Sequence, residues 1–370
     1  MVPKLLNYVE TQKDTALPVI KFRGPEELEE AFEAVVADGL KIGSAAVDSP
    51  SLLAAVDTVL EYGVRTGSPL FNNQLFGTPD AVAMAGDWLT SAMNASAYTY
   101  EVAPVFALME TELLVKIGAT LGGEYAKASN VEGLFVPGGS ISNLYAVQVA
   151  RYRSCPKIKE QGNSAAPAPL CAFVSDQIHY SFKKSCSLLG LGSDCLIVVP
   201  TDPVTGAMDS SEFRRLMEES VAAGKKPFFV GTSAGTTVLG AFDPYNEIAD
   251  ICDEYNEKVA PGGVYDEQEG HPGIWMHVDG AWGGSAFLSA KYKYYMAGAE
   301  RANSYSWNPH KMMGATLQTC AFVTRHAGML LNANGTNAAY LFQPDKEYRD
   351  LDYGDKTIQC GRKVDHLKLW

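Results

Sequence analysis

The chain has 370 residues, of which 46% are hydrophobic and 20% are charged, so it is long enough to bury a large core and to form more than one domain. Its 30 Lys and Arg residues against 43 Asp and Glu residues give a net charge of -13. Because no basic run accompanies that charge, nucleic acid is not expected as a partner. The seven cysteines are odd in number and scattered, which predicts reduced thiols in a cytoplasmic protein and excludes a disulfide framework. No apolar run is long enough to predict a membrane span.

The first third of the sequence has helical patterns. Residues 24–62 alternate acidic and apolar positions, and residues 63–79 form a loop rich in Gly, Pro and Asn. Two long helices are expected at 81–93 and 102–121. In the second helix, four apolar residues share one face before Gly122 and Gly123 end it: Phe106, Met109, Leu113 and Ile117.

The period then changes to short apolar runs separated by helical stretches. Seven strands are predicted, at 133–137, 170–175, 195–200, 226–231, 274–279, 304–307 and 319–324. One intervening helix is expected to start with Asp243 as its N-cap and Pro244 in its first turn. Strands that alternate with helices predict an α/β fold with a mostly parallel sheet wrapped by helices. Segments 156–169 and 259–272 are predicted to be exposed loops.

A lysine follows the strand predicted at 304–307, behind the sequence Asn308-Pro309-His310. Ligands of open α/β sheets bind at the carboxyl ends of the strands. A desolvated lysine there is a good Schiff-base nucleophile, which makes Lys311 a candidate for covalent attachment of a carbonyl cofactor. Taken alone, the pattern also fits the commoner case of an exposed loop lysine.

A second candidate, Asp279, lies at the end of the strand 274–279, in the sequence HVDGAWGG. A carboxylate at this edge can pair with a ligand cation such as the protonated ring nitrogen of pyridoxal phosphate (PLP). Ala281 and the glycines leave room for a flat ring. A simple Asp turn remains open, as does a metal site shared with His277. No third ligand is evident, so we expect no metal.

The segment PGGSISN (137–143) runs from a strand into a helix. Glycines let the backbone approach an anion, and the helix N-terminus together with the hydroxyls of Ser140 and Ser142 would suit a phosphate monoester. The segment is not a P-loop, because it lacks the GK[ST] sequence. The alternative is a simple turn in which Ser142 is the N-cap.

Two further residues follow strands. His179 could lie flat on an aromatic cofactor, although a lone histidine is more often structural. Ser233 stands in a GxSxG sequence, the nucleophile elbow of serine hydrolases, which requires a helix immediately afterwards. The β-branched Thr236, Thr237 and Val238 follow instead, so a serine hydrolase remains only an alternative.

In this order, GGSISN, His179, SAGTT, HVDGAWGG and NPHK resemble the group II PLP-dependent amino-acid decarboxylases. FNNQLFG (71–77), YTYEVAPVF (98–106), NPHKMMG (308–314), YLFQPDKEY (340–348) and GDKTIQCGRKVD (354–365) resemble the glutamate and cysteine-sulfinate decarboxylase branch. The resemblance covers the chain from about Gly63 onward. It implies the type I PLP-dependent transferase fold, with a mostly parallel seven-stranded sheet.

The resemblance also implies a division of the chain. Residues 1–62 would be an N-terminal helical segment, and 63–330 the large PLP-binding domain. Residues 331–370 would hold the catalytic loop and the start of a C-terminal small domain that is largely missing. The pattern at Val364–Trp370 is that of an amphipathic helix without a cap, so we expect the sequence to end inside a helix.

Site residues follow from the same resemblance. Lys311 would hold PLP as a Schiff base, Asp279 would pair with its ring nitrogen, and His179 would stack on the ring. The remaining cofactor residues would be Ser140, Ile141, Ser142, Thr237, Ala281, Asn308 and His310. Gln74 and Phe76 would contact the substrate. Tyr340, in the mobile loop that begins at 332–337, would be a catalytic acid that closes over the partner subunit's site.

The expected function is decarboxylation of a small acidic amino acid to its amine and CO2 by a cytoplasmic homodimer, with the active site at the subunit interface. Phe76 resembles the cysteine-sulfinate type more than the glutamate type, which favours cysteine sulfinate or aspartate. The arginine expected to bind a substrate carboxylate would belong to the missing domain, so weak activity is predicted for this sequence alone. The alternatives are an aminotransferase of the same fold, a hydrolase using Ser233, and a binding protein without turnover.

Overall fold

The computed structural model describes residues 1–41, 43, 46–72, 74–261, 265–266, 268–271, 273–343 and 345–370. The chain divides into two compact units, Met1–Pro79 and Asp80–Trp370. The first unit contains three helices: α1 (Val2–Thr11), α2 (Pro25–Glu33) and α3 (Ser49–Tyr62). Helix α3 starts where Asp48 accepts a hydrogen bond from the Ser51 amide, as an N-cap residue does.

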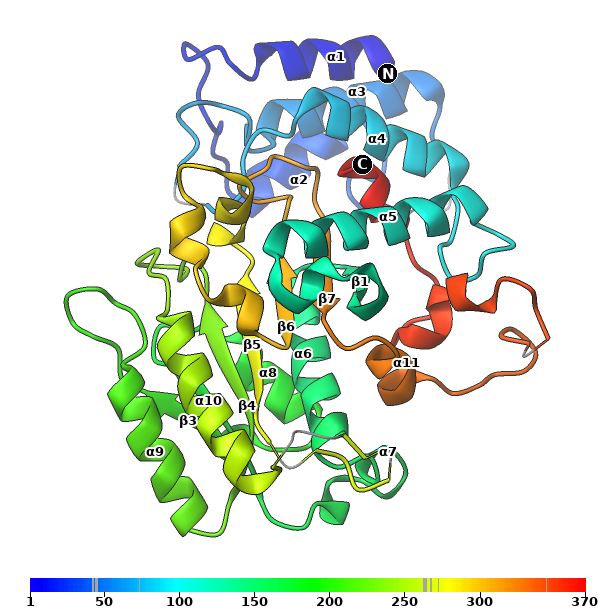
Figure 1. Cartoon of the computed structure of the whole chain (residues 1–370). Helices are drawn as coiled ribbons and strands as arrows, with labels where there is room; N and C mark the ends of the chain where they lie inside the picture. The colour runs from blue at the N-terminus through cyan, green and yellow to red at the C-terminus, as the bar shows by residue number, and fades with distance from the viewer. Residues whose placement is uncertain are drawn as a thin grey trace. The chain divides into compact units, whose positions relative to one another are not determined.

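The second unit is built on a seven-stranded sheet in the order β1-β7-β6-β5-β4-β2-β3 (Figure 1). Strands β2 to β6 run parallel where they pair, whereas β7 is antiparallel to both β1 and β6. All seven strands predicted from the sequence are confirmed. Their bounds are β1 (Glu132–Val136), β2 (Leu170–Ser175), β3 (Leu196–Val199), β4 (Lys226–Ser233), β5 (Trp275–Gly280), β6 (Ser304–Trp307) and β7 (Cys320–Thr324).

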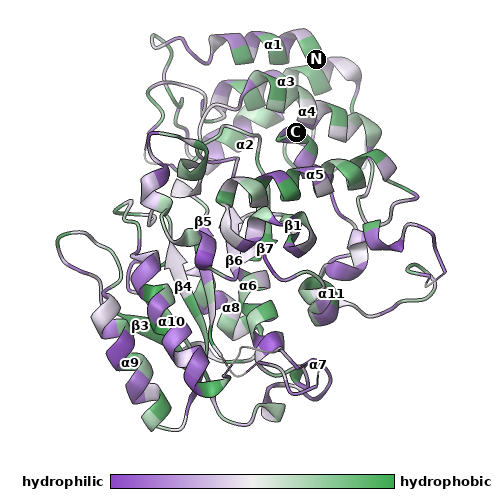
Figure 2. Ribbon diagram, viewed as in Figure 1, coloured by the Kyte–Doolittle hydropathy of each residue, from purple (hydrophilic) through white to green (hydrophobic). Residues whose placement is uncertain are grey.

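Helices wrap this sheet, as the α/β pattern predicted. Figure 2 shows hydrophilic residues along α9 and α10, which pack on the sheet with their apolar sides. The helices are α4 (Ala81–Met93), α5 (Pro104–Leu121), α6 (Gly139–Ser154), α7 (Ile158–Gln161), α8 (Ser181–Leu188), α9 (Ser210–Ala222), α10 (Tyr245–Val259) and α11 (Met329–Asn334).

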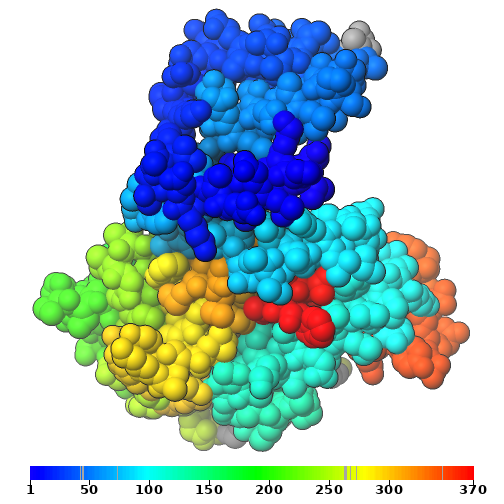
Figure 3. All heavy atoms as spheres, turned by 90° about the horizontal axis from the view of Figure 1, so that it is seen from above, coloured from blue at the N-terminus to red at the C-terminus, as the bar shows by residue number. Residues whose placement is uncertain are grey.

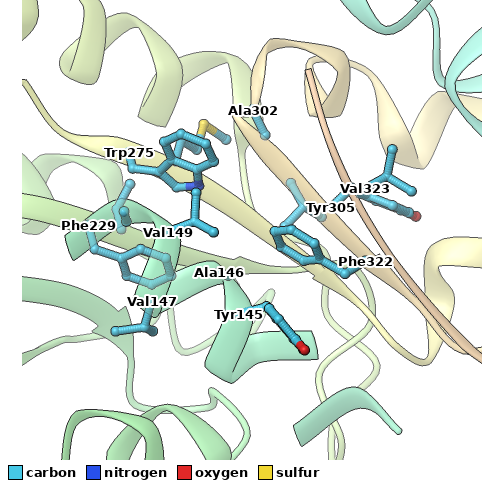
Figure 4. Packing of buried hydrophobic residues seen from close by; sticks show 14 of the residues in the cluster. Tyr145, Ala146, Val147, Val149, Phe229, Trp275, Ala302, Tyr305, Phe322 and Val323 are labelled. Carbon is cyan, nitrogen blue, oxygen red and sulfur yellow. The ribbon is translucent and has the colours of Figure 1, made fainter. Parts of the chain in front are cut away.

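Helix α6 lies across the centre of the sheet and forms much of the core (Figure 4). Its residue Tyr145 packs on Phe322 of β7, with the ring centroids 6.0 Å apart. Strands β4, β5 and β6 are parallel and in register, so that Ser233 pairs with Asp279 and Asp279 pairs with Ser306. The carboxyl ends of these strands therefore meet at one edge of the sheet.

One expectation about α10 was wrong, and the buried face of α5 is wider than the four apolar residues expected to share it. The buried face of α5 contains Glu110 and Leu114, while Met109 and Leu113 are only half-buried. Asp243 is not the N-cap of α10. Instead, its carboxylate is buried and accepts hydrogen bonds from the Met208 and Ser233 amides, each at 2.7 Å.

Two of the three predicted loops differ from the structure, and the third is described only in part. The segment 156–169 is not a plain loop, because it contains α7 and a 3-10 helix at Asn163–Ala165. The second predicted loop, 259–272, lies partly outside the described residues, at 262–264, 267 and 272. The first part of the loop expected at 332–337 belongs to α11.

The last residues form the 3-10 helix η10 (Asp365–Lys368) and not the amphipathic α-helix that was expected. Figure 3 shows this segment lying against α4 and α5. Buried Val364 packs there in a small apolar cluster with Ala103 and Phe106. Across the part of the chain that the structure describes, none of the helices combines the length and apolarity needed to cross a membrane.

Candidate active site

A cavity of about 210 Å³ opens at the carboxyl edge of the sheet. Eight of the sequence-predicted site residues line it: Ser140, His179, Thr237, Asp279, Ala281, Asn308, His310 and Lys311. A larger cavity of about 560 Å³ lies beside β1, between α5 and residues 349–356, but it contains none of those residues. We therefore assign the site to the smaller cavity.

Lys311 and Asp279 reach this cavity from neighbouring strands. Lys311 follows β6 in a turn in which its amide donates to the Asn308 carbonyl at 3.0 Å. Asp279, near the end of β5, is 7% exposed. Its Oδ1 accepts from the Ala281 amide at 3.0 Å, and its Oδ2 accepts from Asn143 Nδ2 at 2.7 Å. These two bonds fix the plane of the carboxylate at the cavity wall.

The first turn of α6 supplies an anion-binding corner. Gly138 has a φ of +97°, and the helix begins at the next residue. A Cβ at Gly139 would lie 2.9 Å from Asn308 Nδ2, so a side chain at this position would displace the Asn308 amide. The first amides of a helix have no partner within it and carry partial positive charge, which suits a phosphate group.

The structure does not bring Ser142 or Ile141 to the cavity lining. Because α6 starts at Gly139 and not near Leu144, Ser142 is turned into the core, where its Oγ lies 2.5 Å from Ser306 Oγ. Ser142 is therefore not the N-cap that the alternative reading required.

Two histidines border the cavity, and neither favours the charged form. Burial lowers the pKa of His179. The charge of Asp279 opposes this effect, but the charge of Lys311 adds to it, and the pKa remains lowered. The Ser181 amide donates to His179 Nδ1 at 3.3 Å, which fits the neutral ring. Burial likewise lowers the pKa of His310, whose Nδ1 lies 2.6 Å from the Thr319 carbonyl.

These residues fit PLP. Lys311 can bond its aldehyde, Asp279 can hold a proton on its ring nitrogen, and the α6 turn can bind its phosphate. Asn308 Oδ1 is buried in the wall without a hydrogen-bond partner, as expected of a site built for a ligand. Ala281 adds only a methyl group to the wall, and Gly235 adds no side chain.

The structure does not support the alternative of a serine hydrolase that uses Ser233. Strand β4 ends at Ser233 and is followed by a turn that bridges Ala234 to Phe242, not by a helix. The strained strand-to-helix elbow that a nucleophilic serine requires is therefore absent at this position.

Besides Ile141 and Ser142, three more predicted residues lie outside this cavity. Tyr340 is 86% exposed, so it does not pack in the core of this chain. Gln74 is exposed, and Phe76 packs on Phe71 at 5.8 Å between ring centroids; both belong to the first unit. Asn73, in the same FNNQLFG stretch, lies outside the described residues, as does Pro344 in YLFQPDKEY.

Sequence reasoning gave no role to Asn143, Tyr180 or Trp282, which all line the cavity. A signal for Asn143 was present, because it follows Gly139 by four residues and so shares its face of a helix. No comparable spacing pointed to Tyr180 or Trp282.

The fold and the cavity define a PLP-dependent enzyme of the type I fold. The family model described as the pyridoxal-dependent decarboxylase conserved domain matches residues 37–370, and the chain belongs to this family. It uses PLP to decarboxylate an amino acid.

Individual relatives support this family assignment. Glutamate decarboxylase of Drosophila melanogaster is 43% identical over 373 residues, which cover 100% of this chain and 67% of the relative. The crystal structure of mouse CSAD is 39% identical with a TM-score of 0.87, and the match covers 100% of this chain and 72% of that one. Oryza sativa TDC with PLP and tryptamine, at 23% identity and a TM-score of 0.82, shares the fold. None of these findings supports an aminotransferase or a hydrolase.

Proposed function

We propose that this chain decarboxylates a short acidic amino acid, namely glutamate, aspartate or cysteine sulfinate, with PLP attached to Lys311. The observation that carries the proposal is the single cavity that unites Lys311, Asp279 and the first turn of α6. Two relatives named for this branch, the Drosophila glutamate decarboxylase and mouse CSAD, support the substrate class.

PLP, once bound, withdraws the electron pair that the departing carboxylate leaves on the substrate. The chain's own residues would serve that chemistry by position. Asp279 would keep a proton on the ring nitrogen, and the neutral ring of His179 would cover the cofactor ring and exclude water. The α6 amides and Ser140 would hold the phosphate. Asn308, His310, Thr237 and Ala281, which line the same cavity, would surround the cofactor.

Tyr340 would complete the site from a second subunit. Its exposure leaves its phenol free to reach a neighbouring chain, where it would return a proton to the substrate Cα and shield the site from stray protonation. We infer a cytoplasmic homodimer with Gln74 and Phe76 at the substrate. The expected division into a large PLP-binding domain (63–330) and a segment that carries the catalytic loop (331–370) is part of the same proposal.

The test is an assay of CO2 release and amine formation from a panel of amino acids. Glutamate, aspartate and cysteine sulfinate should be decarboxylated faster than tryptophan or dopa. Faster turnover of the aromatic amino acids would overturn the substrate assignment but leave the PLP chemistry intact.

A further inference from the structure

Asn143 links Asp279 to a histidine that no step of the proposed reaction uses. His277 lies on β5, two residues before Asp279, and its side chain is fully buried. Its Nε2 is 3.1 Å from Asn143 Oδ1, and Asn143 Nδ2 is 2.7 Å from Asp279 Oδ2. Helix α6 thus supplies an amide that bridges two side chains of one strand.

The donors in this array are fixed at the Asp279 end. The carboxylate of Asp279 only accepts, so the Asn143 amide group that faces it is the NH2. The Asn143 oxygen can then accept from His277 Nε2–H at 3.1 Å and from Ser306 Oγ at 3.2 Å. At the other end, Trp275 Nε1 only donates, and it lies 2.8 Å from Ser304 Oγ. Ser304 Oγ also lies 2.8 Å from His277 Nδ1, which accepts this hydrogen bond when the ring carries its proton on Nε2. The five side chains form one hydrogen-bond chain that points toward Asp279.

Water has little room to replace a member of this chain. His277 lies among the rings of Phe182, Phe229 and Phe322, with centroid distances of 6.0, 6.1 and 6.4 Å. Burial lowers the pKa of His277 to about 4, so the ring remains the neutral link that the chain requires.

We propose that Asn143 is a positioning residue that orients the Asp279 carboxylate toward the ring nitrogen of bound PLP, and that His277 in turn holds Asn143. This rests on the proposed role of Asp279. Without Asn143, the carboxylate would keep its hydrogen bond from the Ala281 amide on Oδ1, but its plane would be free to turn. Hydrogen-bond partners that orient a ligand-binding side chain commonly determine how tightly it binds the ligand.

Substitutions of Asn143 test the proposal, because they change the partner of Asp279 without touching Asp279. Asn143→Ala removes a hydrogen bond to a charged group, so the Kd of the holoenzyme for PLP should rise roughly tenfold. The kcat should fall by a similar factor while KM changes by less than about threefold. Asn143→Asp should be worse, because it sets two carboxylates against each other. Parent values of both Kd and kcat in Asn143→Ala would overturn the proposal.

Gln148→Leu is the matched control. It removes an amide from the same helix, and the oxygen of that amide accepts from Arg151 Nη2 at 2.7 Å, away from the chain to Asp279. Its PLP affinity should match that of the parent. An equal loss in Gln148→Leu would show that α6 is merely sensitive to substitution, which would refute a specific role for Asn143.

A second measurement needs no folded variant of Asn143. In 15N-histidine-labelled parent holoenzyme, the His277 signal, assigned by its absence in His277→Gln, should show the neutral Nε2–H tautomer from about pH 8 to about pH 5. The Nδ1–H tautomer would leave His277 Nε2 without a proton to donate to Asn143 Oδ1 and would contradict the proposal. Neither the tautomer nor PLP affinity depends on the amino acid consumed, so failure of the substrate assignment is distinguishable from failure of this inference.

Discussion

At the scale of single residues, substitution of Asp279 should reduce turnover much more than it reduces cofactor binding. Asp279→Ala should retain part of the PLP, because the α6 turn and Lys311 remain, yet lose most activity, since the ring nitrogen is no longer held protonated. We expect a fall in kcat of roughly a hundredfold or more, in the range of a lost stabilising group. Absorbance of bound cofactor and CO2 release measure the two effects. Near-normal turnover would exclude the role.

Substitution of Tyr340 should affect a later step, because its hydroxyl is proposed to act after CO2 has left. Tyr340→Phe keeps the ring and removes the acid. Amine formation should fall while CO2 release persists over the first turnovers, and pyridoxamine phosphate should accumulate until added PLP restores activity. Amine and cofactor forms can be measured by chromatography. Unchanged amine formation without pyridoxamine phosphate would mean that Tyr340 takes no part.

The sequence predicted most of the residues that line the cavity, but not which residues of the α6 turn face the cavity and which face the core. The Gly and Ser motif was visible, yet which of its residues faces the cavity depends on where the helix begins. Helix α6 starts at Gly139, which turns Ser142 inward and brings Asn143 to Asp279. A start near Leu144 would have left both serines in the turn, which is why the two were first treated alike.

At the scale of elements, a buried ion pair holds the edge strand that leads into this turn. On the edge of β1 away from β7, the amide of Phe135 donates to Glu110 Oε1 at 2.8 Å, and its carbonyl accepts from Arg362 Nη2 at 3.2 Å. Glu110 and Arg362 are themselves paired and buried. Helix α5 and the C-terminal segment thus satisfy the edge strand's polar groups.

Glu110→Gln should therefore destabilise the protein by about 3–5 kcal/mol, because it leaves the charge of Arg362 buried and unpaired. Urea denaturation measures the free energy of unfolding. The control is Glu112→Gln, an exposed carboxylate on the same helix, which should change stability by less than about 0.5 kcal/mol. Equal effects of the two variants would mean that the pair contributes nothing.

The ion pair of Glu110 and Arg362 should also make the stability of the protein depend on pH. Burial raises the pKa of Glu110, but the charges of Arg362 and His366 outweigh it and hold the pKa below the ordinary value of 4.5. A carboxyl group with a lowered folded-state pKa contributes stability above its unfolded pKa, and this is lost as pH falls below about 4.5. The parent should therefore lose more unfolding free energy than Glu110→Gln between about pH 5 and pH 3, the range in which carboxyl groups titrate.

Strands were easier to predict than helix ends for a physical reason. A strand buried on both faces is a short continuous apolar run, which is visible in the sequence. A helix end depends on partners that are distant in sequence. Asp243 has the form of an N-cap, but the Met208 amide, 35 residues away, takes its carboxylate. The last residues, 365–368, form a 3-10 helix against α4 and α5.

At the scale of the whole molecule, the proposal requires two subunits. If Tyr340 acts in the partner's site, a random mixture of Tyr340→Phe and Lys311→Ala subunits should regain activity. Half of the dimers would be mixed, and each would have one complete site, so about a quarter of the parent activity is expected for a twofold assembly. Activity is measured after co-expression and sedimentation. No recovery in a confirmed mixed dimer would show that Tyr340 does not act across the interface.

The central claim is that this decarboxylase attaches PLP to Lys311, at the end of β6 and opposite Asp279. Borohydride reduction of the holoprotein, followed by peptide mapping, tests it most directly, because reduction fixes the cofactor to the lysine that holds it. The pyridoxyl group should be found on the peptide that contains Asn308-Pro309-His310-Lys311. Label on any other lysine would contradict the account.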